Sequence, residues 1–247
     1  MRLKLIACEV LYRELCLAVS RSPHTVDVEF LCKGLHDIGA KGMCSRLRET
    51  VSNVDESRYD AVLLGYALCN NGVVGLTAGS IPLVIPRGHD CITLFLGSRQ
   101  RYDEIFEANP GVYFKTSGWV ERGEADETQL SIQRQTGLGR TLDEYIEEYG
   151  EENGRYLFEM LGNSLHQYSA FAFIAMGLEG EERFEQAARA DADRRGLGFR
   201  SMPGDMTLMQ RLVNGVWDAS DFLVVPPGHQ IVASFDEGLV TAKIEGA

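Results

Sequence analysis

The sequence predicts an α/β protein with parallel sheets in two Rossmann-like lobes. Two observations favour this fold class: short apolar strands alternate with helical patterns, and the order of these elements recurs in the second half of the chain. The 247 residues suffice for two lobes with buried cores. We therefore expect a first lobe over residues 1–110, an insertion over 111–165 and a second lobe over 166–247.

The first lobe is expected to contain one parallel sheet. Its predicted strands cover residues 3–7, 26–31, 60–64 and 83–86. Helical patterns lie between and after them, in EVLYRELCLAVSR, SRLRETVSNV and ITLFLGSRQRYDEIFEAN. Because strands that alternate with such helices form βαβ units, we expect the four strands to lie parallel.

The second half shows a similar order of elements. AFAFIAMG, LGFRSM and DFLVVPPGHQI are predicted strands, and EGEERFEQAARADADRRG and TLMQRLVNGVWD are predicted helices. Either an internal duplication or the general likeness of βαβαβ segments explains the match. The insertion between the halves begins as a strand and turn, continues as one or two helices, and would bridge or cap a cleft between the lobes.

Composition and charge disfavour several functional classes. The net charge of −12 disfavours binding to nucleic acid, and no apolar run reaches the ~18 residues of a membrane span. The six cysteines include no CxxC pair, which argues against a zinc ribbon or a ferredoxin-type motif. We expect a cytoplasmic protein that binds a small-molecule substrate and neither nucleic acid nor a membrane.

Three cysteines follow predicted strands: Cys8, Cys69 and Cys91. Since the carboxyl ends of parallel strands meet at one edge of a sheet, their thiols are expected to lie close together. Three thiolates suit a [4Fe–4S] cluster or zinc with one open coordination position, and we prefer the cluster. Cys8 and Cys91 also precede helices, whose dipoles are expected to favour thiolates. A nucleophilic or redox cysteine and inert packing are the alternatives.

The remaining cysteines are expected to contribute less. Cys32 follows the second predicted strand and is the best candidate for a fourth ligand. Cys16 lies on the apolar face of the first predicted helix and is expected in the core. Cys44 is expected to open a helix at the surface.

Two residues beside these cysteines are candidates for catalysis. His89, in RGHDC, could be an acid/base, a fourth ligand or a hydrogen-bond donor to a ligand. Glu9 follows Cys8 and could act as a base, although a glutamate in a first turn is more often a partner of the helix dipole.

Five residues are candidates for substrate binding. Tyr66 and Trp119 could form walls of a cleft or pack in the core. Asn70 lies in CNNGVVGLTAG, where asparagine and glycine permit left-handed backbone and close approach to a ligand. Arg87 and Arg99 could hold an anionic group.

Several stretches resemble a bacterial and archaeal family, domain-of-unknown-function family 1638. They are ACEVLYREL, VEFLCKGLHD, YDAVLLGYALCNNGVVGL, IPLVIPRGHDCITLFLGSR, GWVE and DFLVVPPGHQI, and they span residue 4 to about residue 231. The resemblance implies that Cys8, Cys69 and Cys91 belong to recurrent motifs of the family, whereas Cys16 and Cys44 do not. It also implies a link with corrinoid-dependent methyltransferase systems and so with one-carbon metabolism.

These observations lead to two functional hypotheses. The first is a metalloenzyme whose open metal position acts as a Lewis acid on a small polar substrate that bears sulfur or a methyl group. The second is a non-catalytic accessory protein that carries a metal, a corrinoid or a methylated ligand for a methyltransferase system. The reaction class (lyase, hydrolase or transferase) and the oligomeric state stay open.

Overall fold

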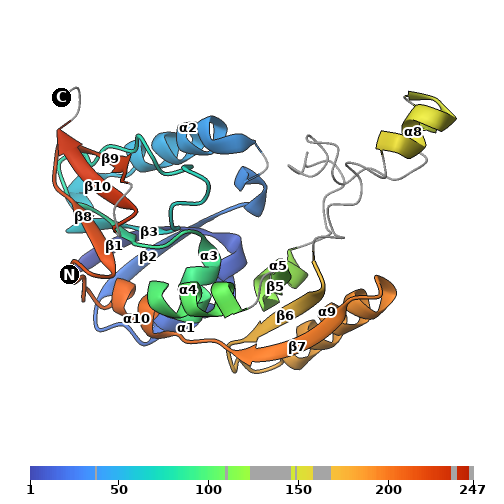
Figure 1. Ribbon diagram of the computed structural model, residues 1–247. Helices are drawn as coiled ribbons and strands as arrows, with labels where there is room; N and C mark the ends of the chain where they lie inside the picture. Colours follow the sequence, from blue (N-terminus) through green and yellow to red (C-terminus); the bar gives the residue numbers. More distant parts are fainter. Residues whose placement is uncertain are drawn as a thin grey trace.

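The protein, seen in a computed structural model, is a mixed α/β chain (Figure 1). The structure describes residues 1–36, 38–108, 111–122, 146–147, 149–157, 168–234 and 238–244. Within these ranges the strands form a five-stranded sheet, a three-stranded sheet and a two-stranded pair. The predicted α/β class with parallel sheets is therefore confirmed.

The main sheet has the strand order β2-β1-β3-β4-β8. Its strands are β1 (Arg2–Cys8), β2 (Thr25–Leu31), β3 (Ala61–Gly65), β4 (Leu83–Pro86) and β8 (Phe222–Val225). β1 to β4 run parallel, as predicted, and β8 runs antiparallel to β4 at one edge. An antiparallel edge strand is common on sheets that are otherwise parallel.

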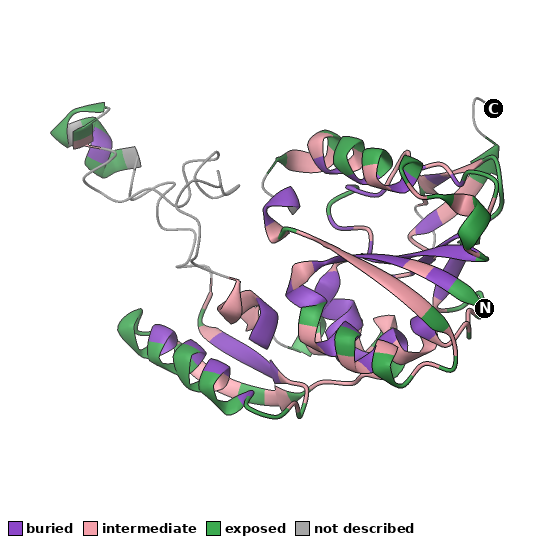
Figure 2. Cartoon of the chain, turned by 180° about the vertical axis from the view of Figure 1, so that it is seen from behind, coloured by how far each residue is buried: buried purple, intermediate pink, exposed green. Residues whose placement is uncertain are grey.

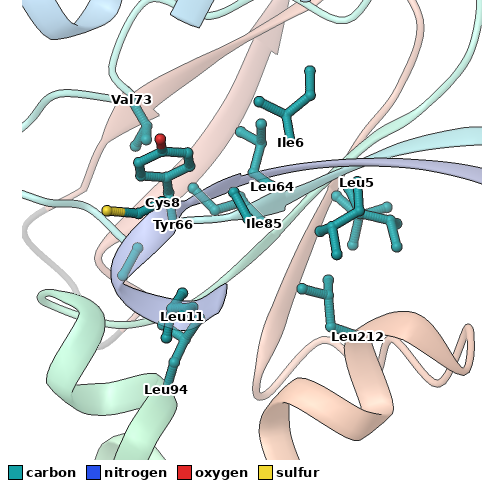
Figure 3. Close-up of a cluster of buried hydrophobic side chains, with 14 of the residues drawn as sticks. Leu5, Ile6, Cys8, Leu11, Leu64, Tyr66, Val73, Ile85, Leu94 and Leu212 are labelled. Atoms are coloured by element: carbon teal, nitrogen blue, oxygen red, sulfur yellow. The ribbon is translucent and has the colours of Figure 1, made fainter. Parts of the chain in front are cut away.

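Helices cover both faces of this sheet. They are α1 (Tyr12–Ser20), α2 (Gly39–Ser52) and α10 (Thr207–Val213). Figure 1 shows α2 on one face and α1 with α10 on the other. Side chains alternate along β1, so Leu5 points toward Leu212 of α10 while Ile6 points to the opposite face (Figure 3). Burial on both faces explains why the central strands β3 and β4 are continuously apolar, whereas the edge strand β2 is only partly buried and carries Asp27 and Glu29.

A second parallel sheet has the order β5-β6-β7. Its strands are β5 (Val112–Lys115), β6 (Ala170–Ala175) and β7 (Gly198–Pro203). Helix α9 (Glu182–Arg194) packs on it through Phe184, which meets Phe173 of β6. β9 (His229–Ala233) and β10 (Val240–Ile244) form the antiparallel pair.

Several further helices lie in the described part of the chain. Those of the 3-10 type are η1 (Glu9–Leu11), η2 (Lys33–His36) and η3 (Glu56–Arg58), and the α-helices are α3 (Cys91–Leu96), α4 (Arg99–Ala108), α5 (Ser117–Glu121) and α8 (Glu151–Leu157). Figure 2 shows buried residues along the central strands and on the inner sides of the helices. Among the described residues, none of the helices combines the length and hydropathy that a membrane crossing requires.

The elements predicted for the second half form in the predicted order, as β6, α9, β7, α10 and β8, but the last predicted strand, DFLVVPPGHQI, divides into β8 and the start of β9. Their pairing crosses the predicted boundaries, because β8 joins the main sheet beside β4 and β5 pairs with β6. Within the insertion predicted over 111–165, residues 123–145, 148 and 158–165 lie outside the described part.

Two expectations about cysteines were wrong. Cys16 is exposed, because the buried face of α1 runs through Glu14, Leu15 and Ala18 and leaves Cys16 on the other side. Cys44 lies inside α2 and does not open it. Two glycines near the start of this helix made its first residue hard to predict, because glycine has a low helix propensity. Tertiary packing overrides that preference in the folded protein.

Candidate functional site

Cys8, Cys69 and Cys91 lie at the carboxyl ends of three adjacent parallel strands. Cys8 ends β1, Cys69 follows β3, and Cys91 follows β4 as the first residue of α3. The chain leaves β1 for β2 on one side and returns to β3 on the other, which makes the β1/β3 boundary a topological switch point. Ligands of open α/β sheets bind at such boundaries. The predicted placement at one edge of the sheet is thus confirmed.

The three thiols are buried and lie near one another. Their residues are 2, 4 and 5% exposed, respectively. The backbone N–H of Cys91 donates to the Cys69 sulfur. A negative charge on Cys8 raises the pKa of Cys69, and charges on both raise the pKa of Cys91. The thiols are therefore close enough for each to affect the ionisation of the next.

Burial is the main influence on these thiols, and it keeps them protonated at neutral pH. It raises the pKa of Cys8 to about 12 and the pKa of Cys69 and Cys91 well above the usual range. The expectation that helix dipoles favour thiolates at Cys8 and Cys91 was wrong for the metal-free chain. The short turn η1 and the six-residue helix α3 do not offset the loss of water around the sulfurs.

Tyr66 lies beside Cys8 and carries a hydroxyl without a partner. Since Ala7 pairs with Gly65, Cys8 and Tyr66 are the next residues of neighbouring strands. In Figure 3 the Cys8 sulfur and the Tyr66 hydroxyl lie at the same end of the cluster. Tyr66 is 1% exposed, and its buried hydroxyl oxygen has no hydrogen-bond partner among the described residues. Such an oxygen marks a place where a ligand atom would be stabilised.

The turn that carries Cys69 has a strained backbone. Cys69, Asn70 and Asn71 have consecutive positive φ values of 45°, 54° and 65°. This left-handed geometry, predicted for CNNG, suits asparagine but is unfavourable for cysteine. The Cys69 N–H donates to the His89 carbonyl at 2.9 Å, which fixes the turn on the loop before Cys91. Strain of this kind persists only where the surroundings enforce it.

The start of α3 fixes the position of Cys91. Asp90 caps the helix, and its Oδ1 accepts the Ile92 N–H at 2.9 Å. Burial raises the pKa of Asp90, whose Oδ2 also accepts the Tyr102 hydroxyl at 3.3 Å. The Cys91 sulfur accepts a hydrogen bond from the side chain of Trp119. Trp119, predicted as a wall of the site, therefore contacts one of the three thiols.

Trp119 reaches Cys91 because α5 packs tightly on η1. A Cβ atom at Gly118 would lie 1.7 Å from the Val10 carbonyl oxygen, so only glycine fits there. Arg13 of α1 binds Glu121 of α5 through two hydrogen bonds of 2.8 and 2.6 Å. The segment that follows β5 thus covers the first turn after β1.

A lysine, Lys33, lies beside Trp119 and near Cys8. The Lys33 ammonium is 5.5 Å from the centroid of the Trp119 ring, and its charge lowers the pKa of Cys8. Cys32, the candidate fourth ligand, is exposed and close enough for its charge to raise the pKa of Cys8. Sequence reasoning missed Lys33, although it directly follows Cys32 at the end of β2 and so meets the same strand-end criterion.

Glu9, the predicted base, is engaged in two contacts. Its Oε1 accepts the backbone N–H of Lys33 at 2.9 Å, and its Oε2 lies 3.6 Å from Arg122 Nη1. These contacts join the turns after β1 and β2 to the end of α5.

The side-chain contacts of His89 and Arg87 are with residues other than the three cysteines. The His89 ring stacks on Tyr102 with centroids 5.3 Å apart, and its Nε2 lies 3.8 Å from Asp103 Oδ1. The Arg87 guanidinium donates to carbonyl oxygens near β8 and β10, including that of Gly238 at 2.7 Å. Arg99 is half-buried at the start of α4. The structure therefore brings Tyr66 and Trp119 to the thiols more clearly than these three residues.

The donor chemistry of the site fits a soft metal, but the donors are not gathered around one point. Within the described ranges, no three His, Cys, Asp or Glu side chains are close enough to hold a metal ion. Three thiols and a buried hydroxyl without a partner are nonetheless the kind of set that a thiophilic centre requires. Binding would require the cysteine side chains to turn toward a common centre.

A separate groove of about 420 Å³ lies between β2 and α2. Some of the charged side chains that line it form ion pairs with one another; for example, Lys4 Nζ lies 2.7 Å from Glu29 Oε2. None of the three thiols lines this groove.

Comparison with known proteins agrees with the resemblance seen in the sequence. The family described as Protein of unknown function (DUF1638) matches residues 30–213, which include Cys69, Cys91 and Trp119, whereas Cys8 precedes the matched segment. Searches of curated proteins and of solved structures returned no match. Because the family match spans most of the chain, the protein belongs to the DUF1638 family.

Proposed function

We propose that the protein binds a thiophilic metal centre through Cys8, Cys69 and Cys91 and uses it to act on a small polar substrate. The observation that carries this proposal is the cluster of three buried, mutually interacting thiols beside the Tyr66 hydroxyl, which has no partner. A [4Fe–4S] cluster is the preferred centre, and zinc is the alternative.

The alternatives that involve no metal explain less of the geometry. Inert packing gives no reason for a buried hydroxyl without a partner or for a cysteine with positive φ at position 69. A nucleophilic cysteine needs a lowered pKa, whereas burial raises the pKa of all three thiols. A soft cation would compensate buried thiolates and displace their protons.

Strand spacing favours a cluster over a single ion. β1 and β4 are separated by β3, which places their axes about 10 Å apart. Two thiolates on one zinc ion lie at most about 4.6 Å apart, because each Zn–S bond is about 2.3 Å. A centre with several irons requires less convergence of Cys8 and Cys91.

Residues around the thiols would prepare the site for its ligand. When bound, a centre with one open position would supply Lewis-acid chemistry. The Tyr66 hydroxyl would hydrogen-bond the substrate, and Trp119 would moderate charge on the Cys91 sulfur. The Lys33 ammonium would attract an anionic group, and Asn70 would line the turn.

The proton-transfer roles of His89 and Glu9 remain part of the proposal, as does the binding of an anion by Arg99. Arg87 is bound to backbone carbonyls, which makes Lys33 the stronger candidate for anion binding. We propose a cytoplasmic location, where free thiols persist.

A second candidate function is that of an accessory protein that carries its ligand without transforming it, with a corrinoid methyltransferase as partner. The proximity of Cys32 to Cys8 favours this candidate, because a fourth thiol would close the open position. The two functions therefore differ in whether a protein ligand, Cys32 or His89, fills the fourth position.

We also propose two Rossmann-like lobes that arose by duplication. The shared strand and helix order of the two halves supports this proposal, whereas the antiparallel pairing of β8 with β4 departs from a strict repeat.

Serine substitutions test the ligand set. Cys8→Ser, Cys69→Ser and Cys91→Ser are each expected to lower the metal content per chain of anaerobically purified protein. Cys44→Ser is the matched control, because its half-buried thiol donates to the Val74 carbonyl at 3.0 Å and Cys44 is not one of the proposed ligands. Unchanged metal content in the first three variants, or an equal loss in the control, contradicts the proposal.

Cys32→Ser separates the two candidate functions. If the open position exists, this variant retains the metal. If the protein is a carrier with four protein ligands, the variant loses metal as the other three do.

A further inference from the structure

The contact between α1 and α5 contains a buried carboxyl group. Glu14 of α1 is fully buried, and the Ser117 hydroxyl donates to its Oε1 at 2.8 Å. Its second oxygen, Oε2, is buried and has no hydrogen-bond partner within the described part of the chain. A carboxyl group in such a place is stabilised when it is protonated and destabilised when it is charged.

This contact is mechanically linked to the thiol site. Ser117 and Trp119 belong to the same five-residue helix, and Trp119 donates to the Cys91 sulfur. Between them, Gly118 lies directly against the Val10 carbonyl, with no room for a side chain. A displacement of Ser117 from Glu14 would therefore move Trp119 away from Cys91.

We propose that Glu14 is a positioning residue of the thiol site, whose protonation state determines whether α5 holds Trp119 against Cys91. The protonated carboxyl is compatible with the buried contact and keeps α5 docked. Ionisation strengthens the hydrogen bond from Ser117, but the cost of burying the charge is larger and favours separation of α5 from α1. The inference rests on the proposed function only because Cys91 is a member of the site. The fluorescence measurement described below does not require a bound metal, so the role of Glu14 and the binding of a metal can each be refuted without the other.

The charges that face Glu14 do not neutralise its carboxylate. Arg13, its neighbour on α1, is engaged with Glu121 of α5. From the turn before α9, the charge of Glu181 raises the pKa of Glu14 further, while its carboxylate accepts the N–H groups of residues 176 to 178. The exposed thiol of Cys16 is the remaining titratable neighbour on α1.

The pH range of this switch follows from the surroundings of Glu14. Burial raises the pKa of Glu14 to about 7, and the hydrogen bond from Ser117 opposes this rise. Below this pH the carboxyl is protonated and α5 is docked. Above it, the buried charge favours release of α5.

Trp119 fluorescence tests the inference directly. The chain has two tryptophans, so Trp217→Phe leaves Trp119 as the sole reporter in the full-length protein. In this background, emission is expected to change with a midpoint of about pH 7. Adding Glu14→Gln should abolish the transition. Adding Ser117→Ala should move its midpoint upward, because the hydrogen bond that lowers the pKa of Glu14 is lost.

Two results would overturn the inference. One is emission that stays constant between about pH 5.5 and about pH 8.5. The other is a transition that persists unchanged with both Glu14→Gln and Ser117→Ala, which would assign it to a group other than Glu14. Ser117→Ala keeps the test decisive if Glu14→Gln fails to fold.

Discussion

Replacing Tyr66 by phenylalanine removes a single oxygen atom from the interior beside the proposed site. The phenol ring is packed in the core, while its hydroxyl has no hydrogen-bond partner. A buried polar group without a partner costs about 1–3 kcal/mol, so Tyr66→Phe should raise the free energy of unfolding of metal-free protein by about 1–2 kcal/mol. For a chain of this size, the melting temperature should rise by about 2–4 °C per kcal/mol.

Urea unfolding followed by circular dichroism measures this change. Tyr59→Phe is the matched control, because the Tyr59 hydroxyl donates to Asp27 Oδ2 at 2.8 Å. The control should lower stability by about 0.5–1.5 kcal/mol, the usual contribution of one hydrogen bond. If Tyr66→Phe is destabilising like the control, the Tyr66 hydroxyl has a partner and does not await a ligand.

Three further predictions follow from the same contacts. Because burial gives Glu14 a pKa of about 7 in place of 4.5, the free energy of unfolding should fall by about 3 kcal/mol as the pH rises between these values and stay level above them. Glu14→Gln should remove that slope, and identical urea curves across pH in both proteins would contradict the assignment. Gly118→Ala should lower the free energy of unfolding by about 2–3 kcal/mol and release Trp119, because the alanine Cβ would overlap the Val10 carbonyl. A change in melting temperature of less than about 1 °C would contradict this prediction. Arg87→Gln should lower the free energy of unfolding by about 2–3 kcal/mol, because carbonyl groups near β8 and β10 lose their hydrogen bonds, and metal content should stay unchanged. A loss of metal without a loss of stability would instead support a ligand-binding role for Arg87.

Strand ends were the most informative feature of the sequence. The position of Cys8, Cys69 and Cys91 at one edge of the sheet follows from periodicity and from the geometry of parallel strands. The left-handed turn at Asn70 and Asn71 could be predicted for a local reason, because asparagine tolerates that backbone conformation.

Other features depend on tertiary packing and could not be predicted from local patterns. Glu14 occupies a position that helical periodicity assigns to the core, yet a glutamate there is ordinarily solvated, and only the packing of α5 explains its burial. Arg87 binds carbonyls far along the chain. The raised pKa of Cys8 reflects total burial, which no local spacing reveals.

Metal and acid-labile sulfide analysis of protein purified without oxygen, together with its visible spectrum, tests the central claim most directly. We expect about four irons and four sulfides per chain with broad absorbance at about 400 nm, or zinc if the alternative centre is bound. Protein that contains neither iron nor zinc, with Cys8, Cys69 and Cys91 all present as free thiols, would contradict it.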